Sequence, residues 1–226
     1  YVLTGDVRAT NIIQYTSPSM SGLQAKLAIM PGEQFDDGTA ATKDAKDGPA
    51  DAISASVSFT QGPIYLALAA DQDLSSSIYA NAAGGIGKIS GQTVDDAYTL
   101  TSAVTNRMDT IRLVGQFTQG PIALGAIYQQ SELHDSDPGE KFDQDGFLLS
   151  AGYTMGQTVL KAQYVQSTLD DGDELDTKSI SLGVDQKLSA QTLVGAYYTA
   201  LTFEWDYTGA ETQEKDVLGA YISHSF

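Results

Sequence analysis

The chain has 226 residues, with 12 Lys and Arg against 29 Asp and Glu, a formal net charge of −17 and no cysteine. This acidic balance argues against nucleic-acid binding, which needs a basic surface, and the lack of cysteine excludes disulfide scaffolds and thiolate metal sites. No apolar run is long enough for a membrane-spanning helix, but this does not exclude a transmembrane barrel, whose strands alternate between polar and apolar residues.

The first part of the chain alternates apolar and polar residues with the period of a strand, and it predicts strands at 8–15, 23–30, 52–59 and 64–71. In the third of these runs Ile53, Val57 and Phe59 alternate with serines. A face made of serine alone is typical of contact with water or a polar lumen, because a packed core needs apolar side chains. Short breaks near Pro18 and Gly62 predict turns, and the polar segment 31–49 predicts a surface loop.

The middle of the chain repeats this hairpin pattern after a long polar loop at 74–104. Strands are predicted at 110–118 and 122–128, joined by Gln119-Gly120-Pro121, which repeats the earlier Gln61-Gly62-Pro63 turn. The repeat indicates an architecture built from similar hairpins rather than from helices.

Five further strands are predicted at 147–153, 160–165, 180–188, 193–205 and 216–226. In the fourth of these, the large apolar residues Leu193, Tyr197, Leu201, Phe203 and Trp205 share one face, which we expect to meet lipid. The last run ends the chain on Phe226 after a mainly apolar alternate face. An aromatic end is unusual for a soluble sheet but suits a strand that meets a membrane interface.

The predicted fold is therefore all-β, with about eleven antiparallel strands and no helix. Turns alternate between short ones, near Pro18, Gly62, Gly120, Gly156 and Ala190, and long loops that hold nearly all the acidic clusters. Short turns at one end and long loops at the other are typical of a transmembrane β-barrel of the outer membrane. A soluble β-sandwich is the alternative, although it has no reason to separate its loops in this way.

Hydropathy also predicts two belts of aromatic side chains on the lipid-facing side. The belt near the short turns contains Tyr15, Phe59, Phe117, Tyr153 and Phe226. The belt near the long loops contains Tyr128, Tyr164, Phe203 and Trp205.

The motif R-x-x-N-I-I-Q-Y-x-S-P-x-x-x-G at Arg8–Gly22, the hairpins that follow and the terminal Phe226 resemble the Gram-negative general porin family. The resemblance implies a barrel of about sixteen strands, in which this motif follows the loop that narrows the pore. Residues 1–226 are then expected to be a single barrel domain, the C-terminal two-thirds of a porin, without the first five strands and the constriction loop. The lack of a secretory signal at Tyr1 agrees with this expectation, and a complete smaller barrel is the alternative.

The resemblance further implies passive diffusion of small hydrophilic solutes and ions through a water-filled channel. It implies a homotrimer in the bacterial outer membrane, in contact with lipid and lipopolysaccharide, with no cofactor. The charge of −17 suggests a mild cation preference. Two other functions stay open: a sugar-type selective channel, for which Tyr65, Tyr198 and Tyr221 are expected to face inward but are scattered, and a structural or adhesive barrel.

Candidate pore-lining residues occupy the alternate strand positions that carry polar side chains: Arg8, Lys26, Arg112 and Lys161, with Gln116 and Gln163 beside them. A charge on the lipid face would cost ~2–4 kcal/mol at mid-membrane, so the positions of these charges indicate which face of each strand points to the lumen. By the resemblance, Arg8 and Arg112 are the best candidates for a basic ladder that faces acidic residues of the constriction loop. The alternative is that these are ordinary solvated side chains of the lumen.

Catalysis and metal binding find little support. His134 and His224 are the only histidines, they lie far apart in the predicted topology, and no hydrolase or zinc-protease motif is present, so no enzyme is expected. The acidic loop with Asp170, Asp171, Asp173 and Asp176 is a weak candidate for Ca²⁺. Its spacing is not that of an EF-hand, and a solvated loop is the favoured interpretation.

Overall fold

The structure, a computed structural model, describes residues 12–31, 52–78, 104–134, 143–170, 174–206 and 211–225, together with positions 3 and 50. No helix in these ranges is long and apolar enough to cross a membrane. The strands are β1 (Ile13–Thr16), β2 (Leu23–Met30), β3 (Ala52–Gln61), β4 (Ile64–Ile78), β5 (Val104–Gln119), β6 (Ile122–His134), β7 (Asp143–Met155), β8 (Thr158–Asp170), β9 (Glu174–Lys187), β10 (Thr192–Trp205) and β11 (Gln213–His224).

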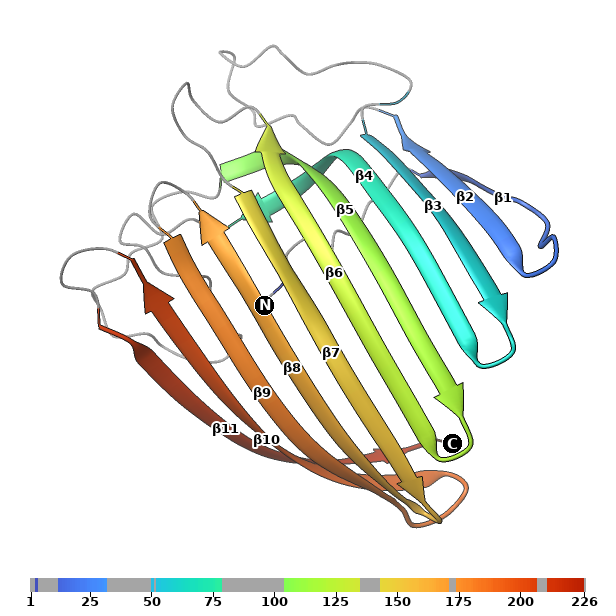
Figure 1. Cartoon of the computed structure of the whole chain (residues 1–226), viewed down its shortest axis with the longest axis vertical. Helices are drawn as coiled ribbons and strands as arrows, with labels where there is room; N and C mark the ends of the chain where they lie inside the picture. The colour runs from blue at the N-terminus through green and yellow to red at the C-terminus, as the bar shows by residue number, and fades with distance from the viewer. Residues whose placement is uncertain are drawn as a thin grey trace.

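All eleven strands belong to one antiparallel sheet, in which each strand pairs with its neighbours in sequence (Figure 1). The predicted all-β fold with eleven strands is confirmed. The sheet is curved and open, and β1 and β11 form its two edges in the part of the chain that the structure describes. Its simple order follows from the hairpin repeat, because strands joined by tight turns pair antiparallel.

The predicted short turns are confirmed at one end of the sheet. Gly62, Gly120 and Gly156 adopt φ values of 56°, 57° and 61°, a left-handed conformation that glycine adopts without strain. The two Gln-Gly-Pro turns also make the same tertiary bond to the next hairpin. The amide of Thr118 donates to Pro63 O at 2.8 Å, and the amide of Thr154 donates to Pro121 O at 2.8 Å.

The strand register assigns every side chain to one of two faces, because residues directly opposite on neighbouring strands point the same way. The convex face is apolar through the middle of the sheet, and its large side chains are exposed: they include Leu27, Val57, Leu68, Leu113, Leu124, Leu149, Leu160 and Leu182. The concave face carries polar and small residues. Such segregation is the reverse of a soluble protein, which leaves few large apolar residues in water.

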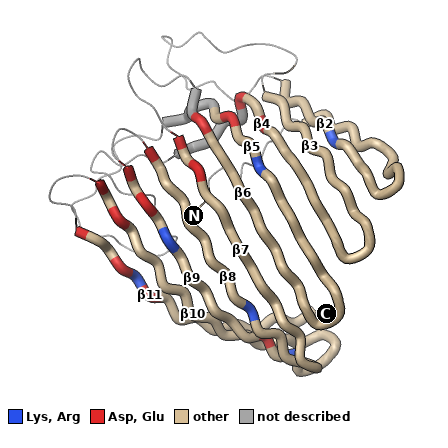
Figure 2. Tube along the Cα trace, in the orientation of Figure 1, with Lys and Arg blue, Asp and Glu red and all other residues tan. Residues whose placement is uncertain are grey.

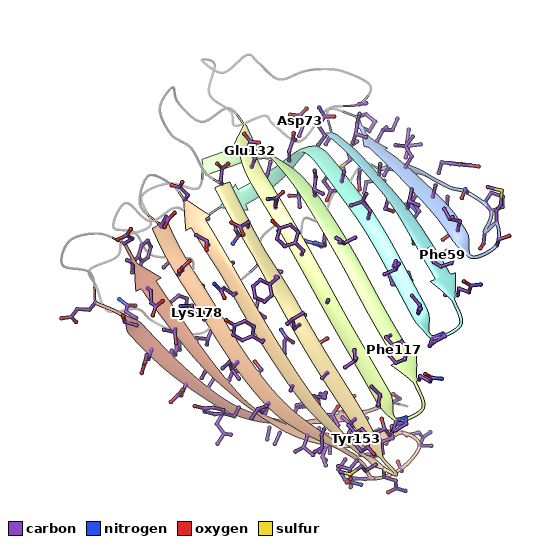
Figure 3. All side chains as sticks on the ribbon, viewed as in Figure 1. Phe59, Asp73, Phe117, Glu132, Tyr153 and Lys178 are labelled. Carbon is purple, nitrogen blue, oxygen red and sulfur yellow. The ribbon has the colours of Figure 1, made fainter. Side chains whose placement is uncertain are left out.

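The aromatic belt near the short turns lies on the convex face, as predicted for Tyr15, Phe59, Phe117 and Tyr153. Figure 3 labels Phe59, Phe117 and Tyr153 close to the short-turn ends of their strands, with Asp73, Glu132 and Lys178 toward the opposite ends. Phe226 lies outside the described residues.

The face assigned to β10 was wrong. Tyr198 pairs in register with Leu182 and Leu218 on the convex face, whereas Tyr197 pairs with Gly183 and Gly219 on the concave face. The concave face therefore holds Leu193, Tyr197, Leu201, Phe203 and Trp205, and Tyr198 does not face inward. Large apolar residues occur on both faces of this strand, so hydropathy alone could not decide which face is convex.

The belt near the long loops is corrected accordingly. Tyr128 and Tyr164 lie on the convex face, and the Phe147 ring packs against Tyr164 with centroids 5.7 Å apart. Tyr198 replaces Phe203 and Trp205 in this belt, and its hydroxyl donates to Asp216 at 2.8 Å. Each of these rings lies close to the first polar residues of the convex face, as is typical of an interfacial belt.

The concave face changes character along the strands. Toward the long loops its side chains are buried, and Met108, Gln129 and Leu175 are each only 1% exposed. A Cβ built at Gly146 on β7 would lie 2.8 Å from the Leu3 side chain, so Leu3 lies against this surface. This packed layer explains why Phe203 and Trp205 turn inward, where they are in register with Thr177 and Leu175.

Candidate functional site

In-register pairs continue from strand to strand, so the concave face is built of rows of side chains that run across the sheet. One row, here called the basic row, contains Lys26, Ser56, Ala69, Arg112 and Gln129 on β2 to β6. Lys26 and Arg112 are thus three strand spacings apart, about 14 Å. The structure places two of the predicted pore-lining cations in one row on one face.

The Arg112 guanidinium is held in place by a buried amide. Arg112 Nε and Nη2 both donate to Gln129 Oε1, at 2.8 and 2.5 Å. Gln129 Nε2 donates to Ser131 Oγ at 3.0 Å, and this hydroxyl also bonds Thr110 Oγ1 at 3.0 Å. Arginine stays charged at all ordinary pH values, so this chain of bonds fixes a permanent positive charge on the concave face.

A second row, the polar row, lies closer to the short turns and contains both predicted glutamines. Its members are Tyr65, Gln116, Gly125, Ser150, Gln163, Ser181 and Thr199, on β4 to β10. Ser181 and Thr199 hydrogen-bond each other at 2.9 Å. The row presents amides, hydroxyls and a glycine, a neutral surface that water wets readily.

Lys161 lies apart from the other cations. The basic row reaches β8 at Ser167, by way of Gly146, and Lys161 is roughly 20 Å along that strand at ~3.3 Å per residue. Its own partners are on β9 and β11. Lys161 Nζ donates to Asp185 Oδ2 at 2.8 Å and to the Tyr221 hydroxyl at 3.2 Å.

Two tyrosines lie flat across neighbouring glycines beside this lysine. On β10 and β11, Gly195 faces Tyr221 and Tyr197 faces Gly219, in register. A Cβ at Gly195 would lie 2.5 Å from Tyr221 Cζ, and a Cβ at Gly219 would collide with the Tyr197 ring. Each ring therefore needs the glycine beneath it, and its other face stays exposed.

A cavity of about 610 Å³ lies against this part of the concave face. Its lining includes Gln116, Ser150, Lys161, Gln163, Tyr197 and Tyr221. The structure thus brings Lys161, Gln116 and Gln163 to one hollow, while Lys26 and Arg112 belong to the basic row nearer the long loops.

Asp185, Gln129 and Tyr197 belong to these arrangements and were not among the predicted site residues. The tyrosines had a signal in the sequence, because Gly-Ala-Tyr occurs at 195–197 and again at 219–221. Gln129 and Asp185 had none, since their partners come from other strands.

Arg8, Asp171 and Asp173 lie outside the described residues. Of the other Ca²⁺ candidates, Asp176 accepts a bond from Thr168 Oγ1 at 2.6 Å. Asp170 stands in register with Glu174 on the convex face. In the described part of the chain, no group of three or more acidic or histidine side chains could hold a metal ion.

Acidic residues gather where the strands meet the long loops (Figure 2). One in-register row of carboxylates on the convex face contains Asp109, Glu132, Asp143, Asp170 and Glu174. Like charges directly opposite one another repel. Such a row suits water or headgroups rather than hydrocarbon, so it marks the edge of the apolar band on the side of the long loops.

Residues 2–204 match the family described as Gram-negative porin. No curated protein matches the chain at a significant level. The family match covers most of the chain, and it agrees with the antiparallel sheet, the apolar convex face and the polar concave face. The chain belongs to the Gram-negative porin family.

Proposed function

We propose that the chain forms the wall of a water-filled channel through the bacterial outer membrane, for passive diffusion of small hydrophilic solutes and ions. The observation that carries this proposal is the opposite character of the two faces. Exposed apolar side chains cover the middle of the convex face, and the concave face holds charged, amide and hydroxyl groups around a cavity. A porin needs this arrangement, with lipid outside and water inside.

The channel is a single barrel domain of about sixteen strands that assembles as a homotrimer, in contact with outer-membrane lipid and lipopolysaccharide. Among the strands that the structure describes, β1 and β11 each pair on one side alone, which supports a larger wall, because an unpaired edge in a bilayer leaves backbone groups unsatisfied. The family supports the lipid environment. The carboxylate row on the convex face supports contact with polar headgroups, because such a row is costly in hydrocarbon.

Planar-bilayer recording of the porin that contains this chain tests the channel function. We expect a large ohmic conductance with little selectivity among small ions. Replacing Arg112 by Gln should move the reversal potential in a KCl gradient toward cation selectivity, because it removes a fixed positive charge. Protein that inserts in the membrane but carries no current would contradict the proposal and favour a structural or adhesive barrel.

The mild cation preference arises from acidic residues at the mouth of the channel. The chain carries −17, and its carboxylates gather at the long-loop ends. Exposed charges act over a Debye length of about 10 Å at 0.1 M salt and about 3 Å at 1 M. The preference should therefore be strongest in dilute KCl and fade as KCl rises. A preference that does not change with salt would place its origin in the narrow part of the pore instead.

One observation favours the sugar-type channel as a second candidate. Tyr197 and Tyr221 line the cavity with exposed ring faces, next to Gln163 and Ser181. A saturable block of the current by an oligosaccharide, lost in Tyr197→Ala, would support it. If the oligosaccharide leaves the current unchanged, the sugar-type channel is rejected.

A further inference from the structure

Three side chains form a compact cluster on the concave face near the short turns, here called the lysine clamp: Lys161 on β8, Asp185 on β9 and Tyr221 on β11. Lys161 Nζ and the Tyr221 hydroxyl bond different oxygens of Asp185, at 2.8 and 2.5 Å, and they bond each other at 3.2 Å. All three mutual contacts are hydrogen bonds, so each polar group is held by the other two.

The backbone of β10 is adapted to this cluster. Tyr221 reaches Asp185 only by lying across β10, and the residue beneath its ring is Gly195. On β9, the Lys161 stem lies against Gly183, where a Cβ would be in ordinary contact with Lys161 Cε at 3.4 Å. The ammonium also lies 5.8 Å from the centroid of the Tyr221 ring.

The clamp differs in charge from the basic row. Arg112 donates its bonds to the neutral amide of Gln129, and these bonds do not offset its charge. Lys161 is held by a carboxylate, whose side chain is 15% exposed against 45% for the lysine. Opposite charges in contact act at a distance as a dipole, whose field falls off faster than that of a single charge.

We propose that Asp185, positioned by Tyr221, masks the charge of Lys161 toward the lumen, so that the lysine clamp itself is electrically neutral and Asp185 is a determinant of ion selectivity. This inference rests on the proposed channel function. Lys161 is then a poor member of the basic ladder, although it lies on the concave face.

Reversal potentials in a KCl gradient test the clamp, in the full porin reconstituted in planar bilayers. Asp185→Asn should shift selectivity toward anions, because it exposes the charge of Lys161. Lys161→Gln should shift it toward cations by a similar amount, because it exposes Asp185. The double variant should return to the wild-type value. Tyr221→Phe should shift selectivity in the direction of Asp185→Asn, by less, because Asp185 loses one of its two bonds.

Lys187→Gln is the matched control, since Lys187 lies on the same face near the end of β9 and is in register with Leu193. Its charge has no acidic residue opposite in that register, so its removal should shift selectivity toward cations. If Lys187→Gln shifts the reversal potential and Asp185→Asn does not, the proposed masking of Lys161 by Asp185 is wrong. A double variant that keeps the full shift of either single variant also overturns it. A wild-type protein without current would overturn the channel function itself, which is a different result.

Discussion

At the scale of single residues, the buried amide of Gln129 determines where the Arg112 charge lies. Gln129 is 1% exposed and accepts both bonds from the guanidinium. Replacing it by Leu would leave the half-buried Arg112 and the buried Ser131 without this partner. Loss of a buried partner of a charged group destabilises by about 1–3 kcal/mol.

We therefore expect Gln129→Leu to lower the free energy of unfolding by that amount, as measured by urea titration of the folded protein in lipid vesicles. Gln116→Leu is the matched control, because Gln116 lies on the same face but is exposed. Its effect should be within about 0.5 kcal/mol. Equal losses from both substitutions would show that burial of the amide is not what matters.

The glycines of the concave face make a second prediction at this scale. A Cβ at Gly195 would overlap the Tyr221 ring, whereas a Cβ at Gly152 meets nothing closer than 3.6 Å. Overpacking destabilises by about 1–3 kcal/mol. Gly195→Ala should lose stability in the same titration by no more than the lower end of that range, because the exposed Tyr221 ring can shift, and Gly152→Ala should change little. If Gly195→Ala in a Tyr221→Ala background loses as much as it does alone, ring contact is not the cause.

At the scale of elements, the alternation of apolar and polar residues was enough to assign faces wherever one parity was clearly polar. The serines of β3 are an example, and Lys26, Arg112 and Lys161 fall on the concave face as predicted. Alternation does not decide the faces of β10, where Phe203 and Trp205 lie on the concave face against a packed layer. Partners such as Asp185 for Lys161 depend on register across distant strands, which periodicity within one strand does not contain.

The corrected faces of β10 can be tested with arginine. Ala196 is in register with Val184 and Ala220 on the convex face, and Thr199 with Ser181 and Val217 on the concave face. An arginine facing lipid destabilises by about 2–4 kcal/mol near mid-membrane. Ala196→Arg should therefore be much less stable in vesicles than Thr199→Arg. The opposite order would restore the original assignment of this strand.

At the scale of the whole molecule, charge and hydropathy are arranged by face and by height. The convex face is apolar between two aromatic belts, and its acidic residues lie beyond the second belt. Near the short turns, the concave face carries the paired Lys161 and Asp185 and also Lys187. It carries Lys26 and Arg112 further along and is packed near the long loops. Composition predicted the acidity but could not show that the carboxylates gather at one end.

The central claim is that the convex face meets lipid and the concave face meets water. The chain has no cysteine, so single cysteines can be placed at 180–184 along β9 and treated with a membrane-impermeant thiol reagent in vesicles. We predict that positions 181 and 183 react and that positions 180, 182 and 184 are protected, with the period of a strand. Protection of all five positions, or the opposite alternation, would contradict the account.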